Sequence, residues 1–135
     1  MKIIRFLDEN ENERYGRQHD DGSATLIEGD IYGEYNDSGA PATVSKLLSP
    51  VHPVDILCIG LNYEEHAKEG GKPLPERPLL FMKTSSSVNH PGDPIVLPRH
   101  LRSDKVDYEC ELVVVIGKRC LNATKDNALD YVLGY

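Results

Sequence analysis

The stretch VDYECELVVVIG (residues 106–117) joins an acidic half to an apolar half. Its second half, with three valines and one isoleucine, is typical of a buried β-strand. In its first half, Asp107, Glu109 and Glu111 occupy every second position. Successive side chains of a strand alternate between its two faces, so these three carboxylates are expected on one face. A row of like charges that leads into a core needs something to neutralise it.

A divalent cation is one answer. In a strand, the Cα atoms of Glu109 and Glu111 lie about 6.5–7 Å apart, from a rise of about 3.3 Å per residue. Two carboxylates at this spacing can converge on one ion, and Mg²⁺ prefers oxygen ligands. Without a cation the two charges repel, and desolvation adds to the cost. The spacing alone does not separate such a site from a solvent-facing strand, where acidic residues are ordinary.

The composition limits the class of protein. The 135 residues suffice for one small domain, and the 39% of hydrophobic residues allow a core of modest size. A net charge of −7 argues against binding to nucleic acid or to an anionic membrane surface. Small anionic substrates remain possible, because a few cationic side chains or a metal can reverse the local charge. The three cysteines have no C-x-x-C spacing, which is typical of reduced thiols in a cytosolic protein.

The first 50 residues predict a small β-rich region. Residues 1–7 favour a strand, and residues 8–23 are polar and rich in turn formers. Residues 24–35 predict a hairpin with Gly29 and Asp30 near its turn. For residues 36–50 we expect a loop with one or two helical turns.

From residue 51 the pattern becomes more regular. Apolar runs predict strands at 54–60, 79–83 and 95–98 besides the one at 106–117, and a helix is expected over 122–135. Between the first two strands, residues 61–71 predict a helix with Asn62 as N-cap and Glu65 as its capping-box partner. Gly70 and Gly71 predict its end. Because the chain stops within an apolar run, we expect it to be the N-terminal part of a longer protein.

One further residue pair and one lysine could carry chemistry. His66 and Glu69, three positions apart on the predicted helix, share one face. A carboxylate beside an imidazole raises its basicity, as general-base catalysis requires, although a helix exposed to solvent would also explain the pair. Lys83 ends an apolar strand, where it can face a substrate carboxylate or extend to water.

Taken in order, these segments resemble the fumarylacetoacetate hydrolase family. The resemblance covers about 60% of the chain, and it rests on IGLNYEEHAKEGG (59–71), PLLFMKTSSSV (78–88), PIVLP (94–98), VDYECELVVVIGK (106–118) and ALDYVLGY (128–135). It implies an α+β, mainly β fold: a mixed β-roll core over 51–135, incomplete at its C-terminus, after the β-rich region of residues 1–50.

The resemblance also implies roles for individual residues. Glu109 and Glu111 would hold Mg²⁺ (or Mn²⁺ or Ca²⁺), with a third ligand beyond Tyr135. His66 and Glu69 would form the catalytic dyad, and the substrate pocket would include Lys83 and Tyr63.

The implied function is that of a metal-dependent hydrolase that cleaves a C–C bond in 1,3-dicarbonyl or acylpyruvate-type 2-oxo acids. The alternatives are an isomerase or decarboxylase of hydroxymuconate-type diacids, and an inactive truncated fragment. We expect a small anionic 2-oxo acid as substrate, no nucleic acid or membrane partner, a cytoplasmic location, and a homodimer of the full-length protein.

Overall fold

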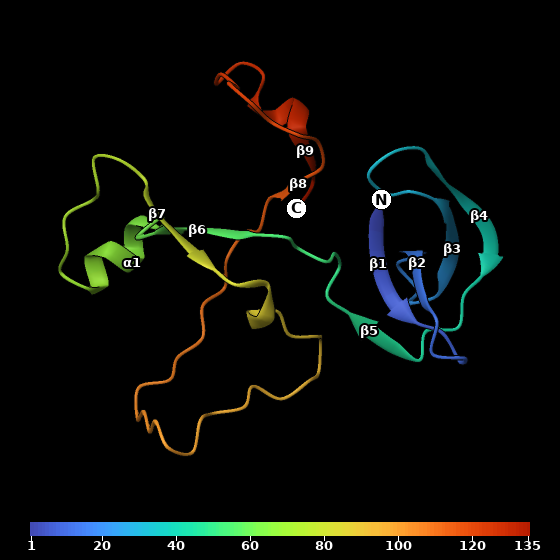
Figure 1. Ribbon diagram of the computed structural model, residues 1–135, viewed down its shortest axis with the longest axis horizontal. Helices are drawn as coiled ribbons and strands as arrows, with labels where there is room; N and C mark the ends of the chain where they lie inside the picture. The colour runs from blue at the N-terminus through green and yellow to red at the C-terminus, as the bar shows by residue number, and fades with distance from the viewer.

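The computed structural model describes residues 1–135 and contains three separate β-sheets (Figure 1). The first fifty residues form a five-stranded sheet, and the rest of the chain carries two antiparallel two-stranded sheets. Figure 1 shows the N-terminal sheet and the two-stranded sheet of β6 and β7 at opposite ends of the molecule. The mainly β class predicted from the sequence is confirmed.

The N-terminal sheet is antiparallel throughout, in the order β4-β3-β2-β1-β5. Its strands are β1 (Lys2–Leu7), β2 (Glu13–Gln18), β3 (Ala24–Gly29), β4 (Tyr35–Pro41) and β5 (Lys46–Leu48). The first strand and the β3–β4 hairpin confirm the prediction. Within the polar, turn-rich stretch of residues 8–23 the sequence showed no sign of β2, yet ERYGRQ pairs with β1 along its whole length. The helical turns predicted after residue 36 are also wrong, because β4 continues to Pro41 and β5 pairs with the other edge of β1.

The core of this sheet is centred on Phe6, which is completely buried. Ile4 and Ala24 join it, and Leu26, Ala42 and Leu47 pack against them. Gly16 makes the close packing possible, because a Cβ at this position would lie 3.0 Å from the Phe6 ring and 2.9 Å from the Thr25 carbonyl oxygen. Burial of a phenylalanine side chain contributes about 1.5–3 kcal/mol.

The second part of the chain has less regular structure. Its elements are β6 (Ile56–Gly60), α1 (Glu64–Glu69), β7 (Leu79–Lys83), η1 (Ser85–Ser87), β8 (Val115–Ile116), η2 (Ala128–Tyr131) and β9 (Val132–Gly134). The two apolar strands β6 and β7 confirm the prediction and pair with Gly60 opposite Leu79. The strand predicted at 95–98 is wrong, and the helix predicted over 122–135 is reduced to one 3-10 turn that leads into β9.

The predicted strand at 106–117 is wrong except for Val115 and Ile116. A strand needs a neighbour to share its backbone hydrogen bonds, and no other segment of the chain lies beside residues 106–114 as a strand. The acidic row is therefore not part of any β-sheet.

Burial differs sharply between the two parts of the chain. Eight of the nine buried residues lie within the first 50 positions, and Ala67 is the only one beyond them. The accessible surface of 11327 Å² is about 1.6 times that of a compact protein of this mass. The apolar strands β6 and β7 were expected to be buried, but β7 is exposed along its whole length and β6 is only partly buried. No helix in this structure has both the length and the apolar character needed to cross a membrane.

Candidate functional site

A strained turn leads from β6 into α1. Leu61 follows the last residue of β6 and has a φ of 51°, in the left-handed region. A side chain other than glycine costs roughly 1–2 kcal/mol in this conformation. Such strain persists only where surrounding contacts hold it, and it is found at functional sites. Here the turn precedes the helix that carries His66.

Helix α1 begins at Glu64, with Tyr63 as its N-cap residue and no side chain that caps it. The predicted capping box of Asn62 and Glu65 is therefore wrong, because Glu65 binds Lys68 instead, at 3.0 Å. Glu64 binds the same ammonium group at 2.9 Å, and the two carboxylates, Glu64 first, raise the pKa of Lys68. The acidic neighbours of His66 are thus paired with a cation.

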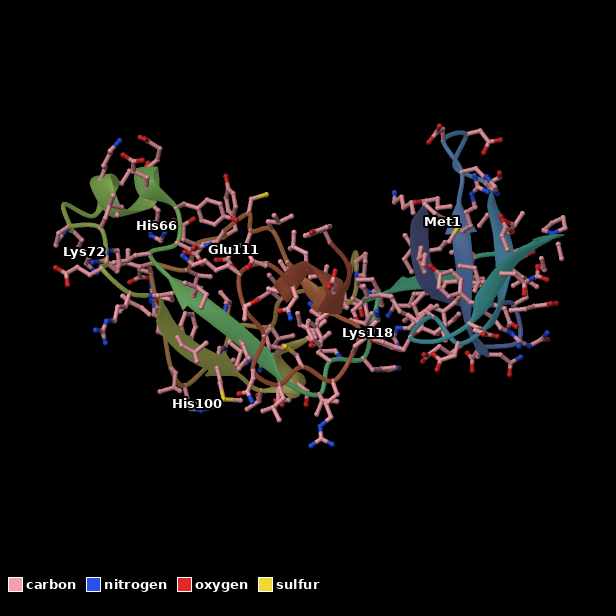
Figure 2. All side chains as sticks on the ribbon, turned by 90° about the horizontal axis from the view of Figure 1, so that it is seen from above. Met1, His66, Lys72, His100, Glu111 and Lys118 are labelled. Atoms are coloured by element: carbon pink, nitrogen blue, oxygen red, sulfur yellow. The ribbon has the colours of Figure 1, made fainter.

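The acidic stretch of residues 107–111 passes close to this helix. The His66 Nδ1 atom lies 3.8 Å from the Glu109 Oε1 atom, which is ion-pair distance for a protonated imidazole and longer than a hydrogen bond. Both side chains remain about half exposed, at 51% and 59%. Figure 2 shows His66 and Glu111 at the same end of the molecule, far from Met1. The structure thus brings together two segments that are more than forty residues apart.

One hydrogen bond fixes the acidic stretch to the beginning of α1. The backbone N–H of Leu112 donates to the Tyr63 hydroxyl oxygen at 2.8 Å. Sequence reasoning placed Tyr63 in the substrate pocket and gave no sign of this contact, since nothing in the local pattern relates residues 49 positions apart. The bond lies next to Glu111 in the chain, so Tyr63 helps to fix the backbone that carries both carboxylates.

The remaining predicted site residues are less closely connected. No hydrogen bond or ion pair joins His66 to Glu69, so the dyad stays a prediction. Lys83 ends β7 with its ammonium 6.0 Å from the Phe81 ring centroid. Glu111 has no cationic partner among the ion pairs of the chain, and Glu109 has only His66.

These carboxylates provide a partial donor set for a metal. Their oxygens suit a hard cation such as Mg²⁺, which commonly binds one or two carboxylates and keeps several waters. No lysine or arginine neutralises either glutamate. The chain contains no cluster of three or more His, Cys, Asp or Glu side chains that could hold an ion. The residues present fit two ligand positions.

Comparison with known proteins identifies the family. The fumarylacetoacetate (FAA) hydrolase C-terminal family matches residues 55–135. The chain belongs to this family.

Several curated relatives are similar to parts of the chain. It is 43% identical over 105 residues, or 78% of its length, to a fumarylacetoacetate hydrolase domain-containing protein 2 homolog of Dictyostelium discoideum. It is 44% identical over 90 residues to the mitochondrial oxaloacetate tautomerase fahd2 of Xenopus laevis, and 50% identical over 80 residues to a 2,4-didehydro-3-deoxy-L-rhamnonate hydrolase of Sphingomonas sp.. These matches cover 66% and 59% of the chain. The chain spans about a third of the length of these relatives, 34%, 28% and 27% respectively.

A solved structure shares the arrangement of the whole chain. A protein of Mycobacterium abscessus superposes with a TM-score of 0.78 at 28% identity, over 100% of this chain and 53% of its own. The similarity therefore includes the N-terminal sheet, which the family match does not cover.

Proposed function

We propose that the protein carrying this chain is a metal-dependent hydrolase that cleaves a C–C bond in 1,3-dicarbonyl or acylpyruvate-type 2-oxo acids. The approach of His66 to Glu109 supports this most directly, because it places a candidate general base beside a candidate metal ligand. Family membership and relatives named as a hydrolase and a tautomerase support an enzyme of this type.

The chain's own residues supply the base and the charges in this proposal. When bound at Glu109 and Glu111, a divalent cation supplies Lewis acidity toward the oxygens of a 2-oxo acid. His66, oriented by Glu69, accepts a proton from water. The resulting hydroxide adds to the carbonyl carbon distant from the carboxylate, and the C–C bond breaks.

The electron pair of the broken bond leaves as the enolate of the smaller 2-oxo acid. A proton then returns to its carbon, so that one diketo acid and one water give two carboxylic acid products. The Lys83 ammonium binds the substrate carboxylate as a point charge. Helix α1 and the acidic stretch, joined through Tyr63, hold the base and the carboxylates on one side of the substrate.

Tautomerisation of a 2-oxo diacid is the second candidate. It is favoured by the 44% identity to the Xenopus laevis protein named oxaloacetate tautomerase. In this reaction His66 would take a proton from the carbon next to the oxo group and deliver it to the enolate oxygen, with no attack by water. The same residues serve both reactions, because both pass through an enolate of a 2-oxo acid.

The experiment that tests the proposal uses the full-length protein with Mg²⁺ present. Release of pyruvate from an acylpyruvate reports hydrolysis, and the ultraviolet absorbance of enol-oxaloacetate reports tautomerisation. We expect turnover of one of them, lost in His66→Ala and kept in His100→Ala, whose histidine makes no side-chain hydrogen bond or ion pair. Equal activity of both variants would contradict the assignment of His66.

A further inference from the structure

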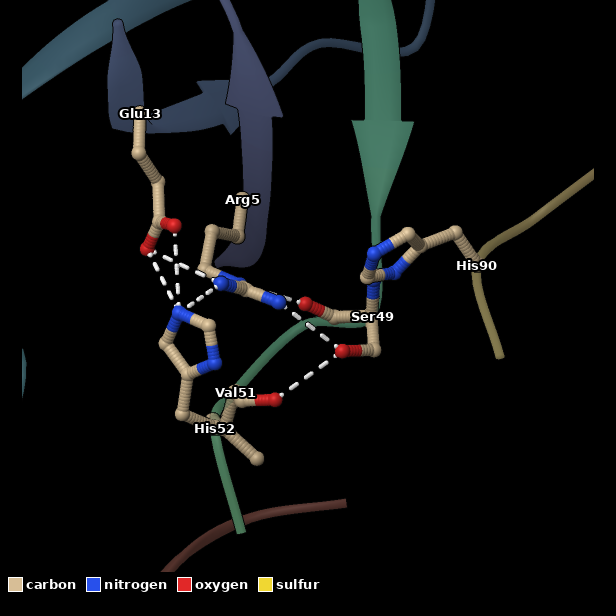
Figure 3. Close-up of polar contacts among 6 residues, drawn as sticks. All are labelled: Arg5, Glu13, Ser49, Val51, His52 and His90. Carbon is tan, nitrogen blue, oxygen red and sulfur yellow. Dashed lines mark hydrogen bonds and ion pairs between the residues drawn. The ribbon is translucent and has the colours of Figure 1, made fainter. Parts of the chain in front are cut away.

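The junction between the N-terminal sheet and the rest of the chain contains a buried charge. Arg5 lies on β1 with only 1% of its surface exposed. Its side chain points away from the Phe6 core, because neighbouring residues of a strand face opposite sides. A buried guanidinium needs all its donors paired. Figure 3 shows the partners that surround it.

Glu13 and Ser49 provide most of the pairing. The Glu13 carboxylate, on β2, lies 2.9 Å from Arg5 Nη1. Arg5 Nε donates to the Ser49 carbonyl at 2.7 Å, and Nη2 donates to the Ser49 hydroxyl oxygen at 2.9 Å. The ring of His52 contacts both Arg5 Nη1 and the Glu13 carboxylate. The Arg5 guanidinium lowers the pKa of the Glu13 carboxyl, and the bond from His52 adds to this effect.

Ser49 connects this network to a distant loop. Its hydroxyl donates to the Val51 carbonyl at 3.0 Å, and its backbone N–H donates to His90 Nδ1 at 3.1 Å (Figure 3). All polar groups of Ser49 are therefore used. A second contact supports the docking of the same loop, because the Lys46 ammonium lies 2.8 Å from the Asp93 carboxylate.

The docked loop is the continuation of the strand that ends at Lys83. The segment of residues 84–94 is held by short internal bonds, from Ser87 N to Thr84 O at 3.0 Å and from Asp93 N to His90 O at 3.1 Å. The Asn89 amide also donates to the carbonyls of Asp93 and Pro94, at 3.3 Å and 3.2 Å. These internal bonds give the segment a defined turn structure directly after Lys83.

The chemistry of the His90 contact fixes its protonation state. Since the Ser49 N–H is the donor, His90 Nδ1 has to accept, and the ring proton belongs on Nε2. Protonation of the ring would make Nδ1 a donor that faces another donor. It would also add a positive charge to a region that already holds Arg5.

We propose that His90 is a positioning residue: in its neutral form it docks the 84–94 segment onto the N-terminal sheet, and its protonation releases this segment. Histidine side chains commonly exchange their proton between about pH 5 and 8, so the test compares the two ends of that range. Any effect of this release on substrate binding by Lys83 rests on the proposed function, whereas the docking itself does not.

Other charged groups face this junction, and their effects have to be distinguished from that of His90. They are Arg5 of β1, Glu13 of β2, Lys46 of β5, His52 of the linker and Asp93 of the loop itself. The same His52 Nε2 atom contacts both the Glu13 carboxylate and Arg5 Nη1, so a proton on it would favour the first contact and oppose the second. The lowered pKa of Glu13 keeps its carboxylate ionised throughout the range in which histidine titrates. The His52→Gln variant separates any contribution of His52 from that of His90.

Hydrogen exchange of the Ser49 amide tests the proposal directly. The rate is measured by mass spectrometry with single-residue fragmentation at about pH 7.5 and about pH 5, and corrected for the intrinsic rate at each pH. We expect protection to fall on the order of tenfold at the lower pH, since one hydrogen bond and its docking are lost. Amides of the β1–β2 ladder, which do not depend on His90, report whether the sheet stays folded.

Three variants sharpen this measurement. His90→Asn keeps an acceptor oxygen near the position of Nδ1 but cannot titrate, so it should be protected at both pH values. His90→Ala should lose the protection at both, and His52→Gln should keep the pH dependence. Equal protection of the wild-type amide at the two pH values, or a pH-dependent loss in His90→Asn like that of the wild type, would overturn the proposal. Neither result bears on catalysis, so failure here is distinct from failure of the proposed function.

Discussion

Tyr63→Phe removes the hydroxyl that accepts the Leu112 N–H while it leaves the ring in place. A neutral hydrogen bond contributes about 0.5–1.5 kcal/mol. Tyr63 is 41% exposed, so water can replace part of the bond, and about 0.5–1 kcal/mol is the relevant range. If this energy helps to hold the backbone that carries Glu109 and Glu111, the variant should bind Mg²⁺ about 2- to 5-fold more weakly.

The assay is a calorimetric Mg²⁺ titration of the full-length protein, with exchange of the Leu112 amide as a metal-free readout on the same samples. Tyr108→Phe is the matched control, because Tyr108 is 89% exposed and its hydroxyl has no hydrogen-bond partner. Loss of protection at Leu112 in Tyr63→Phe alone supports the positioning role. If the two variants bind Mg²⁺ equally and exchange Leu112 equally, the reasoning is refuted.

Three other outcomes follow from the same structure. His66→Ala removes the proposed base, so it should lower kcat by about 10²- to 10⁴-fold with little change in the affinity for a substrate analogue. A loss of kcat below about threefold in steady-state kinetics would make His66 an ordinary surface residue. The lowered pKa of Glu13 stabilises the N-terminal sheet at neutral pH; this contribution is lost as the pH falls below about 4.5 and through the folded-state pKa, so urea unfolding should show acid destabilisation that is reduced in Glu13→Gln. The 135 residues alone should associate through the open edges of the β6–β7 sheet, and a monodisperse monomer in light scattering would contradict this.

The sequence predicted the elements whose signal is local. The apolar runs of β6 and β7 and the glycine near the β3–β4 turn identify their own structures. Gly29 has a φ of 98°, and a Cβ there would lie 2.3 Å from the Glu34 carbonyl oxygen. In contrast, the polar strand β2 exists because β1 pairs with it, and no alternation in ERYGRQ indicates this.

The helix prediction over residues 122–135 is also wrong because of a pairing partner elsewhere in the chain. The segment expected to be a helix over 122–135 ends in a strand because Gly134 pairs with Val115, and Gly117 N donates to Tyr131 O at 2.8 Å. A tertiary partner overrides local propensity in such cases.

The roles assigned to the candidate site residues stay predictions, and only some of their contacts could be foreseen. The resemblance to the family pointed to His66 and Glu109, and the structure brings them within 3.8 Å. The bond from Leu112 to Tyr63 and the strained turn at Leu61 could not be predicted, since each depends on how distant segments meet. The junction of Arg5, Ser49 and His90 could not be predicted for the same reason.

Metal removal tests the central claim most directly. Turnover of the full-length protein is measured in EDTA and after Mg²⁺ is added back, for the wild type, for Glu109→Gln and for the control Glu64→Gln, whose glutamate pairs with Lys68 outside the proposed site. We expect EDTA to abolish turnover, Mg²⁺ to restore it, and Glu109→Gln alone to weaken Mg²⁺ binding by at least about tenfold, or about 1.4 kcal/mol. Full activity in EDTA would contradict the metal-dependent mechanism.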